Sequence, residues 1–148
     1  MNVHARRKAR HYALQALYQW QISGTPPKEI VEQFIANQID KKIDLEYFTE
    51  LVNGVPANSS AIDAEMSVFL KRPLEELDPI ELAIMRMGIY EFLFRLDIPY
   101  RVVINEALEL TKKFGSVEGF KFVNGVLDQV ARKIRSVEVA ADVKTRHG

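Results

Sequence analysis

The segment from Asp78 to Leu96 constrains the fold most, because it carries the start signals of a helix and is apolar on almost every side. Asp78 is a preferred N-cap residue, Pro79 suits the first helical position, and Glu81 follows the cap by three residues. A helix that is apolar most of the way round is buried by its neighbours. A membrane span is disfavoured, because each charged side chain in it would cost about 2–3 kcal/mol in lipid. The segment therefore predicts the central helix of a soluble helical core.

One strip of this helix is less apolar and consists of Glu81, Gly88, Glu91 and Arg95. We expect the strip to be the exposed or partner-facing edge of the helix, with Glu91 and Arg95 as an i,i+4 ion pair. Arg86 stands instead among apolar neighbours, where a buried structural ion pair is the expected role of a cation.

Length and composition limit the domain count and the location of the chain. With 148 residues, of which 47% are hydrophobic, we expect a single domain with a core of its own. The absence of cysteine excludes disulfides, zinc–cysteine sites and thiol catalysis, and it fits a cytoplasmic protein. No signal-peptide pattern and no long uncharged apolar run occur, so we expect a soluble protein that is not exported and has no membrane segment.

Helical spacing also marks the chain before the central helix. From about His4 to Ile22, alanines recur on a narrow face that lets another helix approach closely. The opposite face, which we expect to point outward, carries Arg7, His11, Leu14 and Tyr18. A short second helix follows the Gly-Thr-Pro-Pro break at residues 24–27. A third helix is predicted from residue 44 to about residue 70, with a kink or break near residues 53–54 because of the proline at position 56.

Two more helices are predicted after the central one. The first ends at Phe114, where Gly115 suits the left-handed position that follows a helix. Ser116 can cap the second, which has an uninterrupted apolar ladder from Val123 to Ile134. No segment alternates with a period of two. The fold class is therefore all-α, with two antiparallel three-helix bundles in one compact domain.

The domain is expected to span residues 1–136, with sub-bundles at about 1–70 and 78–136. Residues 137–148 lack a periodic apolar face strong enough to pack, so they are expected to form a flexible tail.

Signals of an enzyme are weak in this sequence. Its three histidines lie near the termini, no phosphate-binding or dinucleotide-binding glycine motif occurs, and the acidic residues are spread along helix faces. We therefore expect no catalytic activity, no metal and no cofactor, and a role in binding.

The first candidate binding motif is the basic run RRKAR at residues 6–10. Net charge is zero, yet no acidic residue precedes Glu29, so the chain has a basic arm on a neutral body. The run could be a solvated helix start. However, cations at a helix N-terminus oppose the helix dipole, a cost that an anionic ligand would reverse.

The second candidate motif combines residues 114–116 with residues 120–124. By helical geometry Phe122 points about 90° away from the apolar ladder, so it is at best half buried, and Lys121 points nearly opposite the ladder. Phe122 could simply widen the core contact. Alternatively, an aromatic face beside Lys121 and a helix N-terminus could hold an unpaired base and its phosphate.

Three blocks of the sequence together resemble the NusB family of bacterial transcription antitermination factors. They are ARRKARHYALQALYQW, LEELDPIELAIMRMGIYEF and IPYRVVINEALELTKKFGSVEGFKFVNGVLDQVA, which cover more than half of the chain. The resemblance implies a protein that binds single-stranded boxA RNA of the nascent transcript together with the ribosomal protein NusE. It also implies that this complex, alongside NusA and NusG, helps RNA polymerase resist termination in ribosomal RNA operons.

The resemblance also implies roles for particular residues. The RNA-binding residues would be Arg6, Arg7, Lys8, Arg10, Phe114, Gly115, Ser116, Lys121, Phe122 and Asn124. The positions near NusE would be Tyr18, Glu75 and Glu81.

Two alternatives remain open from the sequence. A similar helical domain precedes the catalytic part of ribosomal RNA cytosine methyltransferases, but no cysteine is present to serve as their nucleophile. The chain could also be a protein-interaction adaptor without specific RNA binding.

Overall fold

The chain folds into helices joined by short loops. The structure is a computed structural model that describes residues 2–37, 39 and 42–147, with only the backbone of residue 147. In this part of the chain there is no strand. The helices are α1 (Val3–Ser23), α2 (Pro27–Asn37), α3 (Leu45–Ala57), α4 (Ser59–Ser67), the 3-10 helix η1 (Leu74–Glu76), α5 (Pro79–Phe94), α6 (Tyr100–Phe114), α7 (Val117–Ile134) and α8 (Ser136–His147).

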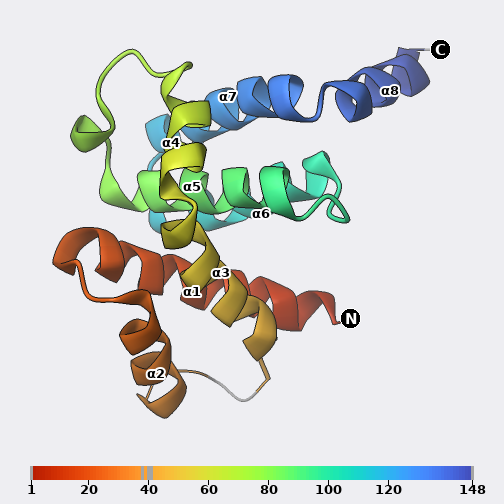
Figure 1. Ribbon diagram of the computed structural model, residues 1–148. Helices are drawn as coiled ribbons and strands as arrows, with labels where there is room; N and C mark the ends of the chain where they lie inside the picture. The colour runs from red at the N-terminus through yellow and green to blue at the C-terminus, as the bar shows by residue number, and fades with distance from the viewer. Residues whose placement is uncertain (1, 38, 40–41, 148) are drawn as a thin grey trace.

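The helices form two bundles that share the surroundings of α5. In the first bundle α1, α2 and α3 pack together, and in the second α5, α6 and α7 do so. Helix α5 also packs on α1 and α3, and α4 lies against α5 and α7 (Figure 1). The predicted all-α fold with two three-helix bundles is confirmed.

Helix α5 begins as its sequence predicts. The Asp78 carboxylate accepts hydrogen bonds from the backbone N–H of Ile80 at 2.9 Å and of Glu81 at 3.1 Å. The expectation of an exposed strip is wrong in its middle, because Gly88 and Glu91 are both buried. Neighbouring helices cover the middle of α5, so the polar residue there must find a partner inside the protein.

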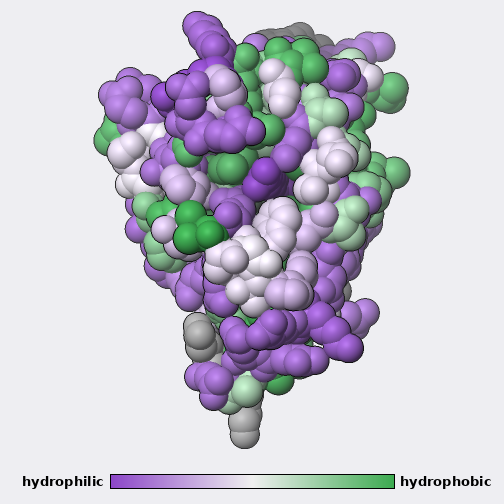
Figure 2. All heavy atoms as spheres, turned by 60° about the vertical axis from the view of Figure 1, so that its left-hand side comes forward, coloured by the Kyte–Doolittle hydropathy of each residue, from purple (hydrophilic) through white to green (hydrophobic). Residues whose placement is uncertain are grey.

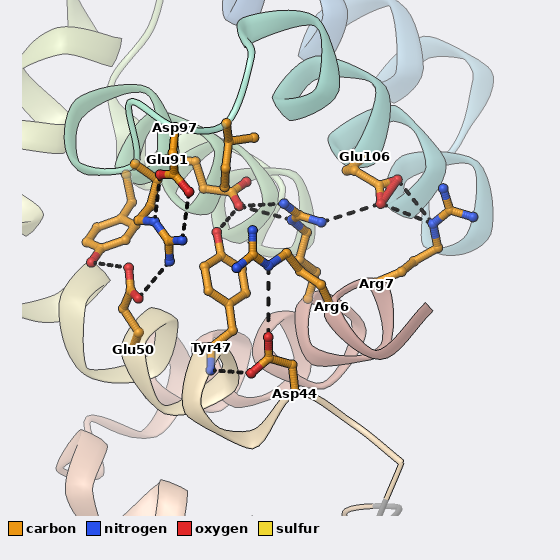
Figure 3. A network of polar contacts seen from close by, with 12 residues as sticks. Arg6, Arg7, Asp44, Tyr47, Glu50, Glu91, Asp97 and Glu106 are labelled. Atoms are coloured by element: carbon orange, nitrogen blue, oxygen red, sulfur yellow. Dashed lines mark hydrogen bonds and ion pairs between the residues drawn. The ribbon is translucent and has the colours of Figure 1, made fainter. Parts of the chain in front are cut away.

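That partner is Arg10 of α1, which is 4% exposed, whereas Glu91 is 2% exposed. The Arg10 guanidinium donates to Glu91 at 2.9 and 3.0 Å and to Glu106 of α6 at 3.4 Å. The Tyr47 hydroxyl of α3 also donates to Glu91, so four helices meet at one carboxylate cluster (Figure 3). Burial alone would lower the pKa of Arg10, but attraction to Glu91 outweighs it and keeps the pKa above its usual value.

The predicted long third helix is two helices in the structure. The break lies at Asn58, with φ −117° and ψ 20°, and not at the predicted residues 53–54. Pro56 cannot donate a hydrogen bond, so it sits in the last turn of α3, where few further bonds are needed. Asn58 then closes the turn, because its backbone N–H and its side-chain amide both donate to the Gly54 carbonyl, at 3.1 and 2.8 Å.

The expectation of a flexible tail is wrong, because residues 136–147 form α8. Arg135 is buried where α7 ends, and it donates to the backbone carbonyls of Glu91, Phe92, Arg95 and Ile98 at 2.9–3.2 Å. It also donates to Glu138 of α8, which accepts from the Tyr100 backbone N–H at 2.8 Å. Polar contacts therefore hold α8 against the rest of the protein. The spacing of apolar residues in the sequence gives no indication of such contacts.

Substitution of Arg135 tests this docking. In Arg135→Met, the four backbone carbonyls lose their common donor, and buried acceptors without a partner are costly. We expect the free energy of unfolding to fall by about 3–5 kcal/mol in urea denaturation. Arg132→Met, which loses only an exposed pair with Asp128, is the matched control and should change it by less than about 1 kcal/mol. Equal losses would contradict the role of Arg135.

Substitution of Glu91 tests the buried cluster. Glu91→Gln leaves Arg10 and Tyr47 without their charged acceptor in the core, so we expect a loss of about 3–5 kcal/mol in the same measurement. Glu109→Gln removes a carboxylate of an exposed pair with Lys112 and should be nearly neutral. A stability of Glu91→Gln close to that of the unsubstituted protein would show that the cluster does not hold α1 on α5.

Candidate nucleic-acid interface

The basic run at the start of α1 points in three directions. Asn2 caps the helix, with its side chain accepting from the backbone N–H of His4 and Ala5. The helical turn then directs consecutive side chains to different neighbours. Arg10 turns into the core, so the prediction that it contacts RNA is wrong for this structure.

Arg6 turns toward α3 and is largely covered. Its guanidinium carbon lies 4.3 Å from the centre of the Tyr47 ring, and its Nε lies 3.9 Å from Asp44. The ring and the carboxylate attract this cation within the protein, although its buried Nε has no hydrogen-bond partner among the described residues. Arg6 therefore packs beneath the surface and does not form part of it.

Arg7 turns toward α6 and stays at the surface. Its Nε donates to both oxygens of Glu106, at 3.0 and 3.2 Å, while the side chain is 55% exposed (Figure 3). The hydrogen bond to Glu106 raises the pKa of Arg7 above its usual value. Within the described part of the chain, its terminal amino groups make no hydrogen bond. Arg7 is thus anchored at Nε and presents its outer donors to an anion.

A groove runs between the start of α1 and the end of α6. It has a volume of about 370 Å³ and is lined by His4, Arg7, Lys8, His11, Tyr12 and Lys113. Lys8 is exposed at its rim, as predicted for a surface cation. Leu14 is buried, contrary to the expectation that it faces outward with Arg7.

The loop between α6 and α7 continues this surface. Ser116 caps α7 as predicted, with its Oγ accepting from the Gly119 backbone N–H at 3.0 Å. Gly115 is extended, with φ −118° and ψ −165°, so the left-handed conformation expected there is wrong. It is needed for close approach, because a Cβ at this position would lie 2.9 Å from the Thr111 carbonyl oxygen. A hollow of about 440 Å³ is lined by Lys112, Gly115, Ser116, Val117, Phe120 and Lys121.

Phe122 lies in the next hollow along the surface. It is partly buried, as its helical position predicts, and packs against the core with one side. The other side lines a cavity of about 450 Å³ that also contains Lys71, Arg72 and Lys121. Asn124 is exposed one turn after Phe120, although it lines none of these hollows. Phe122 can thus pack against the core with one side of its ring and still offer the other side for stacking of a base.

Phe114 joins the two predicted motifs. Its ring centre lies 5.2 Å from that of His11 on α1, and Lys113 Nζ lies 5.9 Å from it. The hollows therefore follow one another from α1 past Phe114 to the start of α7. We call the cations along them the basic track: Arg7, Lys8, Lys71, Arg72, Lys112, Lys113 and Lys121.

Sequence reasoning missed part of this track. The sequence predicts an outward position for His11 but no role for it, and it assigns no RNA contact to Lys71, Arg72, Lys112 or Lys113. These residues lie together because separate helices meet, and no local pattern in the sequence carries that information.

Two of the residues expected near a protein partner, Glu75 and Glu81, lie close to Arg72 of the basic track, whereas Tyr18 is on α1. Tyr18 is 39% exposed on α1, and Glu75 is exposed on η1. Glu75 lines a cavity of about 520 Å³ together with Trp20 and Leu74. Figure 2 shows the side where α1 ends and η1 lies, with patches of hydrophobic side chains separated by hydrophilic ones.

The predicted ion pair of Arg86 forms part of the wall of this cavity. Its guanidinium donates to both oxygens of Asp63 at 2.9 Å, and to the Gln21 side chain at 3.0 Å. The structural role expected for Arg86 is confirmed.

Glu81 occupies a different place, beside the first turn of α7. A Cβ at Gly119 would overlap its carboxylate, so a side chain there would displace the end of Glu81. Burial raises the pKa of Glu81, and the neighbouring charge of Asp78 raises it further. Glu81 therefore lies between the partner side and the α6–α7 loop.

In residues 2–37, 39 and 42–147, no group of three or more His, Asp or Glu side chains could hold a metal ion. None of the described helices is long and apolar enough to cross a membrane.

Comparison with known proteins agrees with this geometry. The model of the NusB family matches residues 7–132. The transcription antitermination protein NusB of Alcanivorax borkumensis is 50% identical over 136 residues, covering 92% of this chain and 91% of the relative. NusB of Pseudomonas savastanoi pv. phaseolicola is 51% identical over 136 residues, with 92% and 82% covered.

Solved structures show the same fold. NusB of T. maritima superposes with a TM-score of 0.77 at 32% identity, covering 86% of this chain and 90% of that one. A crystal structure of the antitermination factors NusB and NusE in complex with dsRNA matches with a TM-score of 0.80 at 27% identity, covering 89% and 99%. With the family model spanning most of its length and relatives identical at half of the aligned positions, the chain belongs to the NusB family.

Proposed function

We propose that this protein is a transcription antitermination factor that binds single-stranded boxA RNA along the basic track, together with NusE. The observation that carries the proposal is the contact of Phe114 with His11 of α1, between a groove lined by Arg7 and Lys113 and a hollow lined by Gly115 and Lys121. Membership of a family whose members are named for antitermination supports it, as does the solved complex of NusB and NusE with dsRNA. The proposal assigns no catalytic step.

The proposed RNA contacts differ from the initial set in two residues. Direct contacts come from Arg7, Lys8, Phe114, Gly115, Ser116, Lys121, Phe122 and Asn124. Arg6 and Arg10 act from within the protein, because aromatic and carboxylate groups already occupy their guanidinium groups.

Affinity and sequence choice have separate origins in this proposal. Neutralising about four phosphates would give a log–log salt slope of about −3, independent of sequence. Stacking of one base on Phe122 would add about 1–3 kcal/mol. Hydrogen bonds to unpaired base edges, from groups such as Ser116 and Asn124, would supply the sequence preference.

NusE is proposed to bind the side that carries Tyr18 and Glu75 and the cavity beside them. A partner that extends the RNA site would share the cost of ordering the strand, so RNA and NusE should bind with positive coupling. Assembly with RNA polymerase, NusA and NusG in the cytoplasm completes the proposed role.

Binding to a boxA RNA and to a scrambled RNA of equal length, each with and without NusE, tests the proposal. We expect tighter binding to boxA and a further gain when NusE is present. Equal affinity for both RNAs under all conditions would leave an adaptor without specific RNA binding, which the cavity near Glu75 would also suit.

Single substitutions on the basic track test its role. Arg7→Ala and Lys121→Ala each remove one phosphate contact, so we expect the salt slope to fall by about 0.7 and affinity to fall about fivefold at 0.1 M salt. Lys144→Ala removes an exposed cation on α8, away from the track, and should leave both values unchanged. Fluorescence anisotropy with labelled boxA RNA measures them. Equal effects of all three substitutions would point to nonspecific charge attraction alone.

Charge reversal at Glu75 tests the partner side. Glu75→Lys changes the charge at the rim of the cavity, so we expect binding to NusE to weaken about tenfold in calorimetry while binding of RNA alone is unaltered. Glu32→Lys, on the exposed face of α2, is the matched charge reversal and should retain NusE binding. Retention of full NusE affinity by Glu75→Lys would argue against this surface.

A further inference from the structure

We infer that His11 is a further phosphate-contacting residue of the basic track, and that RNA binding is accompanied by uptake of a proton on its imidazole. The inference rests on the proposed function, since it requires an RNA strand on this surface. It adds a pH dependence that the arginine and lysine contacts do not have.

The position of His11 supports the contact. It follows Arg7 by one helical turn, so the two side chains lie on the same side of α1. Both line the groove of about 370 Å³, where they face Lys113 of α6. The His11 ring is held between Phe114, with ring centres 5.2 Å apart, and Tyr12, at 5.5 Å. A strand that passes from Arg7 to the α6–α7 loop must cross this ring.

The ring nitrogens of His11 are open to a ligand. Neither hydrogen-bonds to any residue in the described part of the chain, although the side chain is half-buried. An imidazolium there could donate to a phosphate oxygen, as the outer amino groups of Arg7 could.

The charges around His11 favour its neutral form in the free protein. The titratable and charged groups that line its two adjoining hollows are His4, Arg7, Lys8, Arg10 and Tyr12 of α1, and Glu106, Glu109 and Lys113 of α6. Burial lowers the pKa of His11, and the charge of Lys113 lowers it further. Glu106 does not offset this effect, because Arg7 and Arg10 already share its charge.

A bound phosphate reverses this balance. A phosphodiester is negative throughout the physiological range, and an opposite charge in contact favours the protonated imidazole and raises its pKa. By linkage, RNA then binds more tightly as the pH falls from the raised pKa of the complex to the pKa of the free protein, and the gain levels off below that. The full gain is about tenfold for each unit that the pKa rises.

The test compares pH profiles of RNA affinity. Dissociation constants for a boxA RNA oligonucleotide are measured with the full chain at pH 7.5, 6.5 and 5.5 at constant ionic strength. When the pH is lowered from 7.5 to 5.5, we expect the affinity of the unsubstituted protein for the RNA to rise at least about threefold more than the affinity of His11→Gln does. His147→Gln, which removes a histidine at the end of α8, is the control and should keep the full gain.

The ring protons of His11 provide a direct readout by NMR, in which the pKa should rise when RNA is added. The same pH profile for the unsubstituted protein and His11→Gln, or a His11 pKa that RNA leaves unchanged, would overturn the inference. If either of these results is found while boxA RNA still binds tightly at pH 7.5, the inference about His11 fails but the proposed function stands. Absence of boxA binding at every pH would overturn both.

Discussion

The burial of Arg10 between Glu91 and Glu106 is the interaction on which the rest of the structure depends. A guanidinium removed from water is tolerated only when carboxylates and hydrogen bonds replace its hydration, and here two helices supply them. The pairing fixes both the depth and the rotation of α1 against α5 and α6. Once that rotation is set, Arg7 can only face α6, and Arg6 can only face Tyr47 on α3.

One basic run therefore serves two purposes. Its inner members hold the bundles together, and its outer members form the start of the basic track. Glu106 connects the two, because it pairs with buried Arg10 and with exposed Arg7. This sharing holds Arg7 by its Nε alone, so the outer half of the guanidinium is oriented before any anion arrives. The proposed RNA-binding surface is thus connected to the buried ion pairs of the core through Glu106.

Local chemistry made much of the fold predictable. The caps formed by Asp78 and Ser116 and the partly buried ion pair of Arg86 follow from residue type and spacing. The burial of Glu91 and Arg10 and the formation of α8 could not be predicted in this way. They depend on groups that lie 37 to 96 residues away in the chain. The same limit applied to the candidate site, where exposure of Lys121 was predicted but the meeting of Phe114 with His11 was not.

The corner between α5 and α7 links the two proposed binding sides. Glu81 stands at the start of α5, and its carboxylate lies so close to α7 that a side chain at Gly119 would displace it. Ser116, which caps α7 and lines the basic track, binds the backbone N–H of that same glycine. A partner that contacts Glu81 would therefore act on the turn that shapes the RNA hollow, over a path of a few directly packed atoms. Such a path is a physical basis for coupling, because a shift at either end changes the packing at the other.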